Sequence, residues 1–443
     1  MKELFIIGLI LSIVIFIFRV SYIGFGVWGD GAGYYVYARS LYFDQDLDFH
    51  NEYKILRKFP VKNKIITRWF WDSPATVTGN LPNHWSIGPG LLWLPFIFIG
   101  DFLVKIINLF GGNFTHDGFS LPYEIAVGIG NILYGFLGLF FLSKWLSNYF
   151  PRRIVIAAIL SIYLATSLLY YISFEPNLSH GISFFIVSLF LYIWQKTLKS
   201  KTYLNYAMLG IVCGLAAIIR HYDVVLILIP IAQILHHIIF IKKRYDIYIQ
   251  YLIILIAFFL VGITPQLLSQ KIIYGNFLYQ PYILEGNAQA LSLKNNFVLS
   301  TLFSLKRGLF FWSPILLISI VGWVIGYKKY SKICFIFLFI FLTQWMVIGH
   351  WSAALSAGFG ARMYISIYPL FAFGLALLFQ KIKNTKFITI IIVLFTTWNL
   401  LLLNQFFVDK RLLEGQLSLS QIIEGQITNL PKIPKKLFFS RDL

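Results

Sequence analysis

Two stretches near the start of the chain decide how the rest is interpreted: residues 4–18 read LFIIGLILSIVIFIF, and residues 28–35 read WGDGAGYY. An uninterrupted apolar run within a longer hydrophobic segment is typical of a membrane-spanning helix. No small-residue cleavage site follows it, so we expect a retained anchor and not a removed leader. The second stretch places Asp30 between Gly29 and Gly31, where the first helix ends.

The composition of the whole chain agrees with a membrane protein. Of 443 residues, 58% are hydrophobic and only 12% are charged, against roughly 25% charged in soluble domains. Aromatic residues make up 19%, which suits lipid-facing surfaces and interfacial belts. The net charge of +19 accompanies no nucleic-acid-binding motif, so we expect membrane lipids as partners and not nucleic acid. Both cysteines, Cys213 and Cys334, lie inside apolar segments and are expected to act as small core side chains.

Further apolar segments predict an all-α polytopic fold. Stretches of roughly 18 to 25 residues, long enough to cross about 30 Å of hydrocarbon, begin near Leu4, Leu121, Ile154, Gly181, Tyr203, Val224, Ile247, Leu309, Ile333, Met363 and Phe387. They predict about eleven transmembrane helices. A twelfth candidate, residues 89–110, is apolar but interrupted by Pro95, Asp101 and Lys105.

The placement of cations predicts the orientation. Fourteen cations lie in five short loops: Arg152, Arg153, Lys196, Lys199, Lys201, Lys242, Lys243, Arg244, Lys328, Lys329, Lys332, Lys381, Lys383 and Lys386. The alternating short loops hold only Arg220 and Arg362. By the positive-inside rule the first set is cytoplasmic. We therefore expect a multi-pass protein of the cytoplasmic membrane with its N-terminus inside.

This orientation also assigns the loops. If the helix that follows residues 89–110 descends to the cytoplasmic face, that segment should not make a full crossing, and we expect it to lie along or dip into the outer interface. An ordinary span with inverted loop charges is the alternative. The first outer loop then covers residues 24–120 and contains juxtamembrane helices. The transmembrane domain covers residues 1–407, and residues 408–443 form a tail on the outer face.

Asp30 is the leading candidate for chemistry. An inverting sugar transfer from a phosphate leaving group needs one carboxylate to orient and deprotonate the acceptor hydroxyl, whereas glycoside hydrolysis uses two. The glycines beside Asp30 let the backbone turn and leave its carboxylate at the membrane boundary, which suits the role of that base. The alternative is a structural one, because Asp is a favoured helix N-cap.

Polar residues in the other outer loops are candidates for the same site. Glu175 lies at the second outer tip, where an ionisable group at the edge of hydrocarbon is functional by default; a plain loop carboxylate is the alternative. Arg220 and Arg362 suit an anionic lipid phosphate, because guanidinium groups bind phosphate bidentately, with lipid-headgroup contact as the alternative. Weaker candidates for binding substrate are His84, His180, His221, Lys306, Arg307 and His350.

No metal or cofactor follows from the sequence. Asp44, Asp46 and Asp48 alternate like acidic metal ligands, but the Gly at the sixth position and the Glu at the twelfth position of an EF-hand are missing. A solvated loop is the expectation here, and a divalent metal stays open.

Several short motifs occur together. They are Asp30 with Tyr34, Tyr35, Arg39, Ser40 and Leu41; Asn83, His84 and Pro89; Glu175 with Pro176; and Trp351, Gly358, Phe359, Gly360 and Arg362. This set resembles the GT-C superfamily of membrane glycosyltransferases, which includes protein O-mannosyltransferases and the lipid A aminoarabinose transferase. Two positions depart from the family pattern: Gly31 stands where a second acid usually follows, and the second tip has Glu in place of Asp.

The resemblance implies a function. The first-loop acid would be the base, the donor a sugar on a polyprenyl phosphate carrier, and Tyr35 and Arg39 part of the substrate-binding region beside juxtamembrane helices. The acceptor stays unknown. A transporter or flippase for lipid-linked or anionic cargo is one alternative, and it would show charged or broken helices at the bilayer midplane. A polysaccharide polymerase or ligase of another fold would share the outer arginines without requiring Asp30.

Overall fold

The structure is a computed structural model that describes residues 2–56, 73–241, 245–279, 281 and 291–432. In these ranges every named element is a helix, and they contain no β-strand. The helices of the first half are α1 (Lys2–Ile23), α2 (Asp30–Arg39), η1 (Ser40–Asp44), α3 (His50–Leu56), α5 (Gly88–Leu109), α6 (Leu121–Leu146), α7 (Arg152–Leu164), α8 (Leu168–Ser173), α9 (Ser179–Lys199) and α10 (Tyr203–Ile219). Those of the second half are η2 (His221–Ile227), α11 (Leu228–His236), η3 (His237–Ile241), α12 (Tyr245–Tyr274), α14 (Ser300–Phe303), α15 (Leu309–Trp312), α16 (Pro314–Gly349), η4 (Arg362–Ile367), α17 (Tyr368–Lys381), α18 (Thr385–Val408), α19 (Lys410–Glu414), α20 (Leu419–Thr428) and η5 (Leu430–Lys432).

Nine helical segments within the described ranges are long and apolar enough to cross a membrane, by length and composition. They are α1, α5, α6, α9, the run from η2 to η3, α12, α16, η4 with α17, and α18. The prediction of an all-α, polytopic membrane protein is thereby confirmed.

The number of segments differs from the predicted eleven for identifiable reasons. The segments predicted to begin at Leu309 and Ile333 share the label α16 but form two arms, because Tyr330 leaves helical backbone geometry. Trp323 of the first arm packs on Phe337 and Phe341 of the second, so both predicted segments are present although they count as one of the nine. The segment predicted from Ile154 is divided between α7 and α8. The helix α10, with 17 residues, is shorter than the other spans, and α5 counts among the nine by its own length and composition.

The bundle has two ends of different character. At one end, Arg153 donates a hydrogen bond to Thr385 at 2.8 Å, and the ring of Tyr149 packs on that of Tyr330. These contacts place the short loops that hold most of the basic residues together at this end of the bundle. Asp30 and Arg362 lie at the opposite end, which we call the site end. The basic residues at 242–244 lie outside the described residues.

The helix α5 packs antiparallel to α6. Trp93 donates to the side chain of Asn131 at 2.8 Å, and Gly100 lies against Tyr123 near the start of α6. At its beginning, Gly88 meets the carbonyl of Ile218 at the end of α10. Thus α5 starts level with the end of α10 and runs toward the first residues of α6. The placement of α5 along the outer interface stays a prediction.

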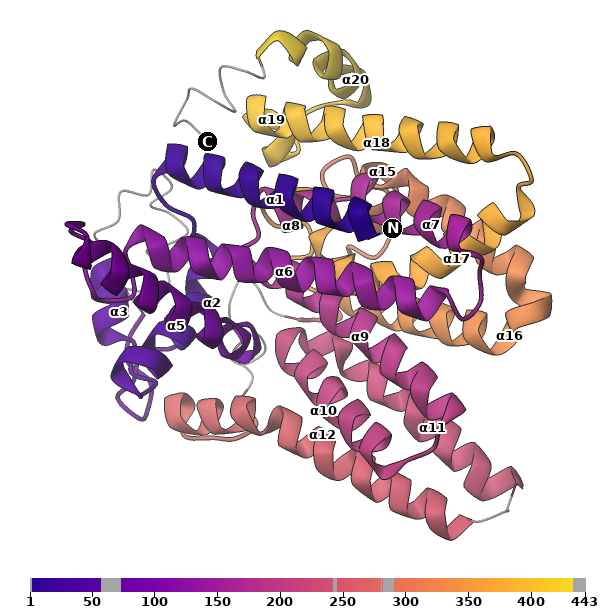
Figure 1. Ribbon diagram of the computed structural model, residues 1–443, viewed down its shortest axis with the longest axis horizontal. Coiled ribbons are helices and arrows are strands. Elements are labelled where there is room, and N and C mark those ends of the chain that lie inside the picture. Colours follow the sequence, from indigo (N-terminus) through magenta and orange to yellow (C-terminus); the bar gives the residue numbers. More distant parts are fainter. Residues whose placement is uncertain (1, 57–72, 242–244, 280, 282–290, 433–443) are drawn as a thin grey trace.

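Two helices extend beyond their neighbours at the site end, as Figure 1 shows for α6 and α12 beside α9 and α10. Gly181, near the start of α9, lies against the carbonyl of Asn131 in the middle of α6. Ten residues of α6 precede Asn131, which at 1.5 Å per residue corresponds to about 15 Å. The tips of α9 and α10 are therefore recessed.

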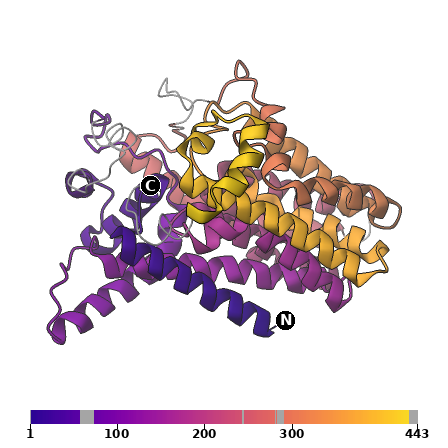
Figure 2. The ribbon, with the colours of Figure 1, turned by 90° about the horizontal axis from the view of Figure 1, so that it is seen from above.

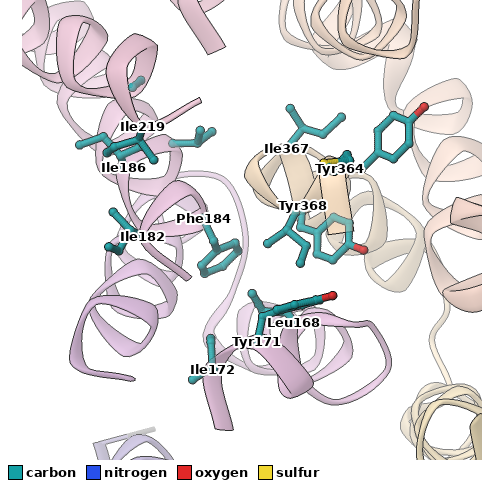
Figure 3. Close-up of a cluster of buried hydrophobic side chains, with 14 of the residues drawn as sticks. Leu168, Tyr171, Ile172, Ile182, Phe184, Ile186, Ile219, Tyr364, Ile367 and Tyr368 are labelled. Carbon is teal, nitrogen blue, oxygen red and sulfur yellow. The ribbon is translucent and has the colours of Figure 1, made fainter. Parts of the chain in front are cut away.

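The recessed tips rest on a dense apolar core. Figure 3 shows Leu168 and Tyr171 of α8, Phe184 of α9 and Tyr364 and Tyr368 of the η4–α17 segment gathered behind them. On one flank, α18 runs along α7, and α20 packs on the last turns of α18 (Figure 2). Close packing of this kind limits how far the elements that carry the site can shift.

Candidate functional site

Asp30 faces an arginine that comes late in the chain. The helix α2 begins at Asp30, and its N-cap is Gly29, which makes no side-chain capping bond. The Asp30 carboxylate instead forms an ion pair with Arg362, with 2.7 Å between Oδ2 and Nη1. The Asp30 side chain is 36% exposed and that of Arg362 only 11%. Asp30 therefore acts across the site and not as the cap of its own helix.

A glycine allows α2 to come this close to the rest of the site. A Cβ atom at Gly31 would lie 2.2 Å from the carbonyl oxygen of Asn177. Asn177 in turn donates to the carbonyl of Gly26 at 2.9 Å. The first turn of α2 is thus held directly against the turn between α8 and α9, where Glu175 lies; His180 follows in the first turn of α9.

Two arginines contact one histidine, Arg220 through its guanidinium and Arg362 through its backbone. Arg220 lies between α10 and η2, and its Nη2 is 2.7 Å from Nδ1 of His180. His180 also hydrogen-bonds to the backbone of Arg362, so its ring bridges the two arginines. The Nε atoms of Arg220 and Arg362 are both buried without a hydrogen-bond partner. In the part of the chain that the structure describes, Arg220 forms no ion pair. The arrangement can therefore take up an anion.

Tyr34 completes this group of residues. It is buried, and Ser179 donates to its phenol oxygen at 3.1 Å. Burial raises the pKa of Tyr34, although Arg220 opposes the shift. The phenol therefore stays protonated and can donate a hydrogen bond toward the charges around it.

Glu175 has an ion-pair partner in the protein itself, an arginine that the sequence did not suggest. It is 7% exposed and forms an ion pair with Arg19 at 3.1 Å. Burial raises the pKa of Glu175, while Arg19 lowers it. Arg19 was not predicted as a site residue because it directly follows the first apolar stretch, where a cation normally marks the end of a membrane span. The structure brings Glu175 near Asp30 as a neighbouring charge and not as a second free carboxylate.

His84 also lies near Asp30. Burial lowers the pKa of His84 to about 3, and the Asp30 carboxylate offsets only part of this shift. Its ring packs at a tilt against that of Trp85, with 4.6 Å between the ring centroids. The preceding residue, Asn83, donates to the carbonyl of Gly33 at 2.9 Å and so ties this segment to α2. His84 is thus a neutral group at the edge of the site.

Tyr35 and Arg39 are not brought into this cluster. Tyr35 donates to the carbonyl of Gly118 at 2.5 Å. Arg39 pairs with Glu52 at 2.8 Å and with Asp44. Their polar atoms are taken up within the first loop because consecutive residues on α2 point to different sides, and only the side of Asp30 and Tyr34 faces the arginines.

His221 and His350 likewise have other neighbours. The ring of His221 hydrogen-bonds to the backbone of Ala217 in the preceding turn. In His350, Nδ1 is 2.7 Å from the carbonyl oxygen of Met346. Neither contact joins the ring to Asp30. Lys306 packs against Gly415, and Arg307 is bonded to backbone carbonyls that are described below.

The acidic loop shows separate partners for its three carboxylates. Asp44 accepts from Arg39 and Asn51, Asp46 accepts from Ser40, and Asp48 contacts His50. Across the described ranges, no group of three or more His, Cys, Asp or Glu side chains lies together in a way that could hold a metal ion.

One buried carboxyl behind the arginines was missed. Asp223 in η2 accepts from Gln344 of α16 at 2.6 Å and from Ser366 of η4 at 2.9 Å. It therefore joins the element that follows Arg220 to the element that begins with Arg362. Its position at the start of an apolar segment was the available signal, because ionisable residues inside such segments are rarely idle.

Comparison with protein-family models, with curated proteins and with solved structures gave no match.

Proposed function

We propose that the protein is a membrane glycosyltransferase of the GT-C type, which moves a sugar from a polyprenyl-phosphate-linked donor to an acceptor hydroxyl at the outer face of the cytoplasmic membrane. The observation that carries the proposal is the ion pair of one carboxylate, Asp30, with Arg362, beside a second guanidinium group, that of Arg220. Both arginines keep a buried Nε without a partner. These residues come from three distant parts of the chain. A base beside an anion site is what an inverting transfer from phosphate requires.

The chemistry balances with these groups alone. Asp30 accepts the proton of the acceptor hydroxyl while the hydroxyl oxygen attacks the anomeric carbon from the side opposite the phosphate. The bond from that carbon to the phosphate oxygen breaks, and its electron pair leaves with the phosphate. Arg220 and Arg362 stabilise the negative charge that develops on the leaving oxygen. Tyr34 contributes a phenol hydrogen-bond donor beside them.

The free protein also suggests an order of events. Arg362 is paired with Asp30, so a donor phosphate that takes up Arg362 releases the Asp30 carboxylate for the acceptor. One exchange of partners then frees both groups: Arg362 binds the leaving phosphate, and Asp30 can take the proton.

The experiment compares three variants in membranes supplied with a labelled polyprenyl-phosphate sugar. We expect Asp30→Asn to lower the rate of transfer by about 10²-fold to 10⁴-fold while the donor still binds, and Arg362→Gln to weaken both donor binding and transfer. Asp48→Asn, which removes an exposed carboxylate of the same loop, is the matched control and should behave like the unchanged protein.

The outcomes also separate the alternatives. Full transfer by a normally expressed Asp30→Asn variant would exclude Asp30 as the base and favour a ligase of another fold. Movement of the donor across the membrane without cleavage would identify a transporter.

A further inference from the structure

The segment after the last long helix reaches the site through Arg307. This side chain is 4% exposed, and all three of its nitrogens donate to backbone carbonyls. Nη2 bonds to Leu413 in α19 at 2.6 Å, Nη1 bonds to Leu355 at 2.8 Å, and Nε bonds to Gly358 at 3.0 Å. One guanidinium therefore joins the C-terminal tail, residues 409–432, to the loop of residues 355–360. Figure 1 shows α19 folded back at the end of α18.

The loop that Arg307 holds surrounds the side chain of Arg362. Ser356 accepts from Nη2 of Arg362 at 3.3 Å. The backbone at Gly358 has a φ of +126°, and a Cβ atom there would lie 2.9 Å from Cδ of Arg362 and 2.7 Å from the hydroxyl of Tyr171. Tyr171 donates to the carbonyl of Phe359 at 3.0 Å. Because these contacts are close, the loop cannot shift without moving the Arg362 side chain.

We propose that Arg307 is a positioning residue through which the C-terminal tail fixes Arg362 in the site. Each of its three nitrogens donates to a backbone carbonyl, so these bonds fix the guanidinium between the loop and the tail; the phosphate-binding role suggested by the sequence stays a prediction. A planar guanidinium presents its donors in a rigid fork, whereas the ammonium group of lysine is a single point charge. Arg307→Lys therefore keeps the charge and loses the geometry. The inference rests on the proposed function in one respect, since it takes Arg362 as a phosphate ligand.

The decisive test is a double-mutant cycle in the full-length protein, with geranyl phosphate as the probe. We expect Arg307→Lys to weaken probe binding by about fivefold to tenfold, within the usual range for coupled neighbours. In an Arg362→Ala background the same change should have no further effect. A residue with a merely structural role would lower binding equally in both backgrounds, and that result would overturn the proposal.

A second variant reaches the same link from the tail. Asp409 accepts from the backbone N–H of Arg411 and caps α19, so Asp409→Ala loosens the helix that supplies the Leu413 carbonyl. We expect a weaker loss of probe binding that is not additive with Arg307→Lys. Lys410→Gln, an exposed change on the same helix, is the matched control and should leave binding unchanged.

Hydrogen exchange tests the link without any ligand. Amides of residues 352–361 should exchange faster in Arg307→Lys and in Asp409→Ala, while those of α6 stay unchanged. If the unchanged protein binds no probe but the loop exchanges faster in both variants, the phosphate proposal fails and the link stands. If the probe binds and neither exchange nor affinity responds to the variants, the positioning role is refuted and the proposed function stands.

Discussion

Replacing Asp30 with Asn should move binding and transfer in opposite directions. The carboxylate competes for Arg362 across 2.7 Å, and the arginine side chain is only 11% exposed. A hydrogen bond to an ionised partner contributes about 1.5–3 kcal/mol and a neutral one about 0.5–1.5 kcal/mol. Asn keeps the shape and one acceptor oxygen, so the change removes roughly 1–1.5 kcal/mol of competition. This corresponds to about tenfold tighter binding of a phosphate.

The rate of sugar transfer should instead fall in the Asp30→Asn variant. Loss of a general base lowers the rate by about 10²-fold to 10⁴-fold. The assay measures geranyl phosphate affinity by calorimetry in detergent, and transfer with labelled donor in membranes, on the same preparations of unchanged and Asp30→Asn protein.

Equal or weaker phosphate binding in a correctly folded Asp30→Asn variant would refute the reasoning, because it would mean that the carboxylate does not compete for Arg362. A structural role of Asp30 predicts that result together with a lower melting temperature.

Three further outcomes are expected. Gly31→Ala should lower stability by roughly 1–3 kcal/mol, measured by thermal unfolding in detergent, because its methyl group would meet the carbonyl oxygen of Asn177. His84→Gln should leave the shape of the pH–rate profile between about pH 5 and pH 8 unchanged, since with a pKa of about 3 the ring gains its proton only well below that range. Val77→Cys and Thr115→Cys, on the two sides of α5, should react with an impermeant maleimide added from one and the same side if α5 follows the interface.

These outcomes have matched controls. A methyl group at Gly181 of α9 would meet nothing closer than 3.6 Å, so Gly181→Ala should be neutral or stabilising by about 0.5–1 kcal/mol. Lys383→Cys, in a basic loop at the other end of the bundle, should react only after the membrane is permeabilised. The native Cys213 and Cys334 are buried and give little background. Labelling of residues 77 and 115 from opposite sides would show that α5 crosses.

The sequence predicted the all-helical class and the main residues of the candidate site for a simple reason. Hydropathy reports long apolar helices directly, and charges isolated in apolar surroundings, such as Arg220 and Arg362, stand out against them. The kink at Tyr330 falls in the basic loop that the sequence places between two spans, whereas the division of α7 from α8 was not visible, because mostly apolar composition continues through it.

The finer arrangement of the site depended on helix rotation, which short motifs do not specify. Tyr34 and Tyr35 are adjacent in sequence, yet one lies beside the arginines and the other bonds to Gly118. Arg39 belonged to the same motif, but the acidic side chains nearest to it in the first loop pair with it first. Arg19 and Glu175 come into contact only when α1 and α8 pack side by side, so the sequence alone could not assign a partner to either residue.

The pairing at His180 also bears on how the protein is made. With the site on the outer face, as proposed, Arg220 has to be carried through the membrane during insertion, and a lone arginine near the middle of a span costs about 2.5–3.5 kcal/mol. Its neighbour His180 is synthesised earlier, on α9, and Asp30 is likewise synthesised long before Arg362. Each cation is therefore synthesised after the residue that it contacts in the folded protein, so that residue is already present when the cation reaches the membrane.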